Sequence, residues 1–353
     1  MNKENGFLVI DGSMLEGGGS ILRLSAGFSL LYNQPIKICN IRGNRDPPGL
    51  KTQHKLGLET LAELTGSKLS KCEIGTREIT FSPKYDLKDS VRVDINTAAS
   101  IGLLIQPIQI AALGFPNDKK ITLNLVGGGT FGKWAPSVNY LREVTYKLFE
   151  KVGLKINVNI KRHGFYPKGG ALLEYTVFGP KKDLNPINIA NLGNIDKIKG
   201  EIICTKSLDH ADVAERIKNS AVNQIRSEIN IETDFSYKYV KSFSTGVGLS
   251  LWAESNTGAV ISSGTIIGER GVPSEEVGKN AANELLRYIK NEIPVDNYLS
   301  DQLIPIMCYI GESKIKVLEI TSHAKTNLEL LKKFTDREYS IQNHDSYSII
   351  KYF

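Results

Sequence analysis

SILRLSAGFSLL at residues 20–31 and PIKICNIRG at residues 35–43 are the two segments from which the fold can be predicted. In the first segment apolar residues recur three and four positions apart, which predicts a helix; in the second they alternate, which predicts a strand. A second helical pattern follows at residues 51–66, and residues 68–83 have the character of strands. The chain therefore starts with a unit of helix, strand, helix and strands.

The same order recurs twice further along the chain. The second copy runs through residues 97–113, 119–129, 135–153 and 154–179, and the third runs through residues 297–310, 313–322, 325–334 and 339–353. Three such units predict an α/β protein in which helices cover one face of a mixed sheet. An α/β chain without true repeats can also be divided into similar thirds, and the sequence leaves that alternative open.

The spacing of the copies indicates an insertion. Their middle strands start near Pro35, Lys119 and Ser313, so the second step is more than twice as long as the first. The extra residues contain their own helical patterns and β-branched runs. We therefore predict a large domain at residues 1–186 and 292–353, and a smaller inserted α/β domain at residues 187–291.

The composition limits the class of protein. Hydrophobic residues make up 41% and charged residues 23% of the 353-residue chain, which is typical of a soluble globular protein. No apolar stretch is long enough for a membrane span and the first residues do not resemble a secretory signal, so we expect a cytoplasmic protein. The four cysteines lie far apart, which favours reduced thiols. The net charge of +6 permits a polyanionic partner without requiring one.

A glycine-rich turn, LEGGGS at residues 15–20, separates a predicted strand from the first helix. Glycines there let backbone N–H groups approach a phosphate closely. A carboxylate beside such a turn is useful mainly when a divalent metal lies between it and the phosphate, which points to Glu16. Arg23 is placed to neutralise another phosphate oxygen. An ordinary tight turn is the alternative.

Three further loops have residues suited to binding phosphate or nucleic acid. Residues 40–57 present several such donors: Arg42, Arg45, Lys51, Gln53 and His54. Residues 161–170, KRHGFYPKGG, form a basic and aromatic turn of the kind that holds an RNA backbone and stacks a base. The alternative for residues 40–57 is a solvated basic loop. For residues 161–170 it is a hairpin with a charged tip, which the sequence favours somewhat. GGGTFGKW at residues 127–134 nearly matches a phosphate-binding P-loop, but Trp134 stands where the metal-binding hydroxyl belongs, so we do not assign one.

His323 has the most suggestive setting of the five histidines. It follows a predicted strand and opens a helix, in EITSHAKTNLELL. The positive field at a helix start disfavours imidazolium and keeps the ring a neutral nucleophile. A capping or buried structural histidine is the alternative.

Together these segments resemble the RNA 3'-terminal phosphate cyclase family. The resemblance rests on DGSMLEGGGSILR, IRGNRDPPGLKTQH, the region of Gln106, RHGFYPKGG, NYLSDQL and SHAKTN, in that order along nearly the whole chain. It implies an α/β fold of the α+β type, with three βαβαββ units like the C-terminal domain of a translation initiation factor and a smaller inserted α/β domain. It also implies an ATP-dependent enzyme of the AMP-forming ligase class.

The implied reaction joins a histidine to AMP, passes AMP to an RNA 3'-phosphate, and closes a 2',3'-cyclic phosphate. The resemblance makes His323 the nucleophile and Glu16 the ligand of Mg2+ or Mn2+, with Arg23 and Arg42 stabilising phosphoryl charge. Arg45 and Gln53 would bind the substrate phosphate. The nucleotide site would comprise six residues: Gln106, Tyr298, Leu299, Ser300, Asp301 and Gln302.

Some positions depart from the family pattern. Ser20 stands where the family commonly has glutamine, Asn44 replaces a small glycine-like position, and residues 127–137 are less proline-rich than usual. Two other functions stay open. One is a non-catalytic cyclase-like protein acting in ribosomal RNA processing, against which the presence of His323 counts. The other is a small-molecule transferase, which leaves SHAKTN unexplained.

Overall fold

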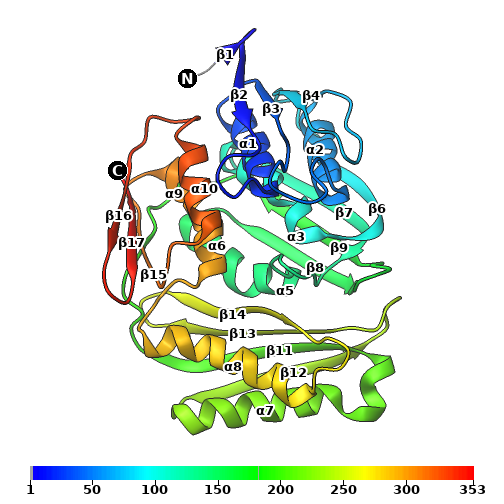
Figure 1. Ribbon diagram of the computed structural model, residues 1–353, viewed down its shortest axis with the longest axis vertical. Helices are drawn as coiled ribbons and strands as arrows, with labels where there is room; N and C mark the ends of the chain where they lie inside the picture. The colour runs from blue at the N-terminus through cyan, green and yellow to red at the C-terminus, as the bar shows by residue number, and fades with distance from the viewer. Residues whose placement is uncertain (1–2, 182) are drawn as a thin grey trace.

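The computed structural model describes residues 3–181 and 183–353, which form four β-sheets with helices packed against them (Figure 1). Three sheets share one order of four strands, to which the first sheet adds one strand at its edge, and the fourth sheet belongs to residues 195–267. This mixed arrangement confirms the predicted α/β fold class.

The first sheet comes from the amino-terminal part of the chain. Its strands are β1 (Lys3–Glu4), β2 (Phe7–Asp11), β3 (Ile36–Cys39), β4 (Lys68–Leu69) and β5 (Ile79–Ser82), in the order β1-β2-β3-β5-β4. Helix α1 (Gly19–Leu31) connects the parallel pair β2 and β3, and α2 (Thr52–Thr65) follows β3. Alternation places Ile36 and Ile38 in the core, and α1 buries Leu24 and Phe28 against it.

The second sheet repeats this plan. Its strands are β6 (Ser90–Ser100), β7 (Lys120–Gly129), β8 (Ile156–Arg162) and β9 (Leu172–Phe178), in the order β6-β7-β9-β8. The parallel pair β6 and β7 is joined through α3 (Ile101–Leu104), α4 (Gln106–Ala111) and the 3-10 turn η1 (Ala112–Gly114). Between β7 and β8 lie α5 (Val138–Tyr140), the π-helical turn η2 (Leu141–Thr145) and α6 (Tyr146–Val152).

The third sheet contains β10 (Asn188–Ile189), β15 (Lys314–Val317), β16 (Tyr339–Asn343) and β17 (Ser348–Tyr352), in the order β10-β15-β17-β16. Helix α9 (Asn297–Ile310) precedes β15 and α10 (Ser322–Leu331) follows it. In all three sheets the first two strands of the unit are parallel and the last two form an antiparallel pair, so each unit is βαβαββ. In the third unit the first strand, β10, is separated from its helix by a long insertion.

The insertion forms the fourth sheet and its own helical layer. The strands β11 (Ile195–Thr205), β12 (Glu232–Val240), β13 (Val247–Ser255) and β14 (Val260–Ile267) have the order β12-β11-β13-β14. After the 3-10 turn η3 (Lys206–Ala211), helices α7 (Val213–Glu228) and α8 (Ser274–Lys290) cover the outer face of this sheet, at the bottom of Figure 1. Side chains such as Ile217, Leu249 and Leu285 fill a hydrophobic cluster separate from the main core.

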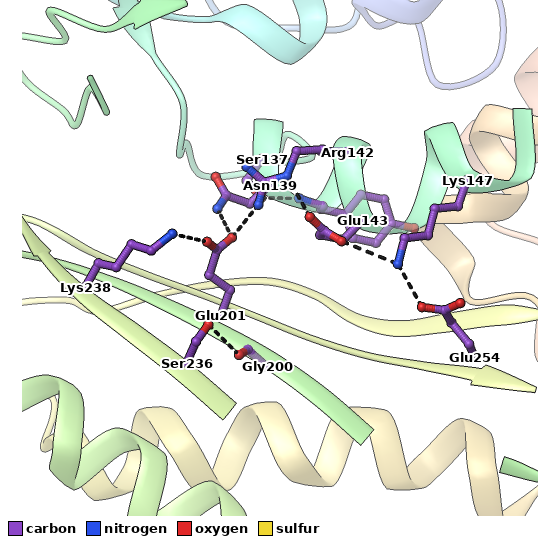
Figure 2. Close-up of polar contacts among 11 residues, drawn as sticks. Ser137, Asn139, Arg142, Glu143, Lys147, Gly200, Glu201, Ser236, Lys238 and Glu254 are labelled. Carbon is purple, nitrogen blue, oxygen red and sulfur yellow. Dashed lines mark hydrogen bonds and ion pairs between the residues drawn. The ribbon is translucent and has the colours of Figure 1, made fainter. Parts of the chain in front are cut away.

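The inner face of the inserted sheet meets the second unit through polar contacts (Figure 2). Glu201 of β11 is buried and accepts hydrogen bonds from Asn139 at 2.5 Å and Arg142 at 2.7 Å. Lys147 lies 2.7 Å from Glu254 of β13. Arginine and lysine therefore hold the inserted sheet against the segment between β7 and β8.

Two further predictions concern the state of the cysteines and the presence of membrane-spanning helices. The four cysteines are free thiols, and three of them are buried. Within the described part of the chain, no helix combines the length and the apolar character that crossing a membrane requires.

Candidate active site

A cavity of about 520 Å³ lies where the three units and the insertion meet. Arg23 enters it from α1, Gln106 from α4, Tyr298 from α9 and His323 from α10. The insertion supplies one wall, through Gly264, Thr265, Ile266 and Ile267 of β14 and Glu284 and Tyr288 of α8. Residues predicted from distant parts of the sequence therefore reach one space.

Arg23 is a buried cation in this cavity, with 8% of its surface exposed. Its Nε donates to Oε1 of Gln106 at 2.6 Å. Burial, with the nearby charge of Arg42, lowers the pKa of Arg23 to about 9. Among the described residues no carboxylate pairs with it. A buried guanidinium without an acidic partner is costly, so the site is built for an anion.

His54 lies next to Arg23, with its Nε2 3.2 Å from Nη1 of the arginine. Its Nδ1 faces the backbone N–H of Lys51 at 3.3 Å, and burial holds its pKa well below the usual value, so the ring is neutral. A Cβ on Gly19 would overlap this imidazole, which explains the glycine at the start of α1. From the sequence, His54 is only one of several donors in its loop, and no site role follows for it. Its position directly after Gln53, at the start of a helix, was the available signal.

Glu16 is buried beside the helix that carries His323. Its Oε2 lies 3.2 Å from Nδ1 of His323, and its Oε1 contacts Arg45. The backbone N–H of Glu16 donates to Oγ1 of Thr326 at 3.2 Å, which ties the glycine turn to α10. A Cβ on Gly18 would come within 2.5 Å of the carboxylate, so glycine is needed there too.

The surroundings of Glu16 fit a divalent cation. Both carboxylate oxygens are buried, and neither makes a hydrogen bond of good geometry. In residues 3–181 and 183–353 no cluster of three or more histidine, cysteine, aspartate or glutamate side chains is suited to a metal. A metal held by Glu16 would therefore take its other ligands from phosphates and water, as Mg2+ commonly does.

His323 occupies the second position of α10. Thr321 caps this helix by accepting from the N–H of Ala324 at 2.8 Å, and its hydroxyl donates to Oδ1 of Asp301 at 2.8 Å. Burial lowers the pKa of His323 and raises the pKa of Asp301 to about 6. The imidazole is thus neutral at pH 7, with one edge toward Glu16 and the helix start beneath it.

Helix α9 brings only part of the predicted nucleotide run to the cavity. Tyr298, Asp301 and Gln302 line it, and the ring of Tyr298 packs against Gly264 and lies edge-on to Tyr140. The side chain of Leu299 lies in the hydrophobic core. Ser300 is buried, and its hydroxyl donates to the carbonyl of Asn297. These two residues do not line the cavity.

The arginine loop lies beside the glycine turn. Arg42 donates to the carbonyls of Pro47 and Gly49 at 2.8 and 2.9 Å, and its charge lowers the pKa values of Arg23 and His54. Asn44, at the position that departs from the family pattern, donates to the carbonyls of Ser13 and Leu15, both at 2.9 Å. Gln53 is half-buried in the first turn of α2. Neither Arg42 nor Gln53 lines the cavity itself.

A family model and individual known proteins that resemble this chain all point to one family. The family model described as RNA 3'-terminal phosphate cyclase matches residues 14–341. A protein of Pyrococcus abyssi named RNA 3'-terminal phosphate cyclase is 37% identical over 337 residues, which cover 95% of each chain. Proteins with the same name are 36% identical over 335 residues in Thermococcus onnurineus, again 95% of each chain, and 34% identical over 343 residues in Methanothermobacter thermautotrophicus, 95% of this chain and 96% of the other.

Proposed function

The chain belongs to the RNA 3'-terminal phosphate cyclase family of enzymes, and we propose that it uses ATP to convert RNA 3'-phosphate ends into 2',3'-cyclic phosphates. One observation supports this most strongly. His323, a neutral histidine at a helix start, lines the cavity together with the buried Arg23, and its ring meets the buried carboxylate of Glu16 beside that cavity. Within the described ranges no carboxylate pairs with Arg23. These are the groups that nucleotidyl transfer through a histidine requires.

In the first step His323 attacks the α-phosphorus of ATP. Its Nδ1–H faces Oε2 of Glu16, which leaves the lone pair of Nε2 free for the attack. The new P–N bond replaces the bond to the bridging oxygen, and pyrophosphate leaves with that oxygen. Arg23 stabilises the charge on the phosphoryl oxygens. Mg2+ or Mn2+ bound at Glu16 would supply further charge neutralisation.

The remaining steps use the RNA end. An oxygen of the 3'-phosphate attacks the phosphorus of the histidine–AMP, and the P–N bond breaks. The vicinal 2'-hydroxyl then attacks the 3'-phosphate, and AMP leaves as the ring closes. A phosphomonoester lacks a good leaving group, which AMP supplies, and the neighbouring hydroxyl makes ring closure intramolecular. Arg45 contacts Glu16 of the glycine turn, and His54 lies against Gly19. Together with Arg42 and Gln53 they would hold this terminal phosphate.

The nucleotide would occupy the part of the cavity between α9 and the insertion. Tyr298 presents an aromatic face there, and Gln106, Asp301 and Gln302 offer polar contacts. We further propose that the protein acts in the cytoplasm, a compartment that keeps thiols such as its four free cysteines reduced.

The test is covalent labelling with ATP labelled at the α-phosphate, in the presence of Mg2+ or Mn2+. The wild-type protein should form an acid-labile adduct, and His323→Ala should form none. His210→Ala removes an exposed histidine of the insertion and serves as the matched control, which should label normally. An adduct that persists in His323→Ala, or no adduct on the wild type, would contradict the mechanism.

A further inference from the structure

Three loops without acidic residues meet at one edge of the molecule. They are residues 130–137, 161–170 and 241–246, called the acid-free loops below. The first and third follow strands β7 and β12, and the second begins with the last two residues of β8 (Figure 1). The cyclisation steps described above use none of their side chains.

Direct contacts join the acid-free loops into one surface. The N–H of Thr130 donates to the carbonyl of Gly164 at 2.9 Å, and the ring of Phe131 stacks on Phe165 with centroids 5.2 Å apart. The N–H of Lys168 donates to Oγ of Ser244 at 3.0 Å. The first two loops are therefore joined by a buried aromatic pair, and the second and third by a hydrogen bond.

Aromatic side chains project from this surface into solvent. The exposed fractions are 93% for Trp134, 79% for Tyr166 and 56% for Phe243. The guanidinium of Arg162 lies 4.6 Å from the centroid of the Phe243 ring. Exposed rings of this size do not contribute to the core, so they are available to stack on a ligand.

The charge of the surface is positive. The acid-free loops carry Lys133, Lys161, Arg162, Lys168 and Lys241. Lys133 pairs with Glu269 at 2.8 Å, whereas across the described ranges Lys161, Lys168 and Lys241 have no salt-bridge partner. Free lysines between exposed aromatic rings suit a chain of phosphates that alternates with flat bases.

The surface also adjoins the active site. Gly132, Lys133 and Trp134 line the same cavity as His323. An RNA strand whose 3' end lies in the cavity can therefore continue over Trp134 toward Tyr166 and Phe243 and stay in contact with the protein surface.

We propose that the acid-free loops bind the single-stranded RNA segment that precedes the 3'-terminal phosphate. This rests on the proposed function, because it names the path of the same substrate. Bases stack on Tyr166 and Phe243, and Lys161, Lys168 and Lys241 contact the backbone. Unpaired RNA is favoured over a duplex, because rings can stack only on bases that are free of pairing.

The experiment compares a dodecamer and a dinucleotide, each with a 3'-phosphate, as substrates of Tyr166→Ala/Phe243→Ala. The KM for the dodecamer should rise about tenfold or more, because stacking on each ring is lost. The KM for the dinucleotide and the rate of His323 adenylylation should stay at wild-type values. Tyr237→Ala is the matched control, since this exposed tyrosine lies under Lys218 on β12 near α7, away from the acid-free loops, and it should leave all three values unchanged.

A second variant tests the electrostatic part. Lys161→Gln/Lys168→Gln/Lys241→Gln should weaken binding of the dodecamer and make its affinity less dependent on salt, since fewer counterions are released. An unchanged dodecamer KM, an equal rise for the dinucleotide, or tighter binding of duplex RNA would overturn the proposal. Adenylylation of the wild type, measured in the same preparations, separates these outcomes from a failure of the proposed function.

Discussion

Arg23 is the single residue that indicates most directly that the site binds an anion. A protein that needed only a stable core would not bury a guanidinium against a neutral amide and a neutral imidazole. The lowered pKa of Arg23 reports the same unfavourable environment. An anionic ligand removes the free-energy cost of burying the Arg23 guanidinium without a counterion. The removal of this cost adds to the affinity of the site for the ligand.

We predict that Arg23→Met lowers the rate of adenylylation by about 100-fold or more, because one donor to the phosphoryl oxygens is lost. The free energy of unfolding should change by no more than about 1–2 kcal/mol, because losing the buried charge offsets losing the hydrogen bond to Gln106. Inorganic pyrophosphate should raise the melting temperature of the wild type and leave that of the variant unchanged. Arg92→Met, which removes an exposed arginine paired with Asp94, is the control and should keep the wild-type response. A variant that still responds to pyrophosphate would show that Arg23 is not an anion ligand.

The helices and strands that depend on local periodicity could be predicted from the sequence. The helices and strands of the three units follow from apolar spacing, and the glycine turn and α10 follow from strand-to-helix changes. The pairing of Arg23 with Gln106, 83 residues away, depends on tertiary packing and was not predictable from spacing. Helical geometry does explain α9: Tyr298, Asp301 and Gln302 share one face, three and four residues apart, so Leu299 and Ser300 turn toward the interior.

The contact between β11 and the α5–η2 segment should contribute to the stability of the protein (Figure 2). Glu201→Ala should lower the free energy of unfolding by about 3–5 kcal/mol, because Asn139 and Arg142 lose the acceptor of a buried ion pair. The side chain of Glu201 is 8% exposed, whereas that of Glu254 at the same interface is 38% exposed. Glu254→Ala should therefore cost about 1 kcal/mol or less. Urea unfolding measures both, and equal losses would show that burial does not govern this interface.

At the scale of the whole molecule, one carboxylate links three parts of the fold around the cavity. Asp296 caps α9 by accepting from the N–H of Leu299 at 3.0 Å. It also accepts from the hydroxyl of Tyr140 in the second unit, at 2.9 Å, and from the N–H of Ser262 in the insertion, at 3.1 Å. The insertion is thus fixed to the wall that carries Tyr298. Such a contact could not be predicted from the sequence, because its partners lie 156 and 34 residues away.

The protonation of Asp296 should make stability depend on pH. Burial raises its pKa from 3.8 to about 7 in the folded protein, so between these values the folded state holds a proton that the unfolded state releases. The contribution of Asp296 to the free energy of unfolding must therefore fall as the pH rises from about 4 to 7, by at most about 1.4 kcal/mol per pH unit. Tyr140 and Tyr288, which face Asp296, have raised pKa values and stay neutral throughout this range. Asp296→Asn removes this titration. The free energy of unfolding of the wild type, measured relative to that of the variant, should therefore decrease between pH 5 and pH 7. This holds even if the variant is less stable than the wild type at every pH. Parallel curves in urea unfolding would mean that Asp296 is ionised in the folded protein at pH 5, with its three hydrogen-bond donors outweighing its burial.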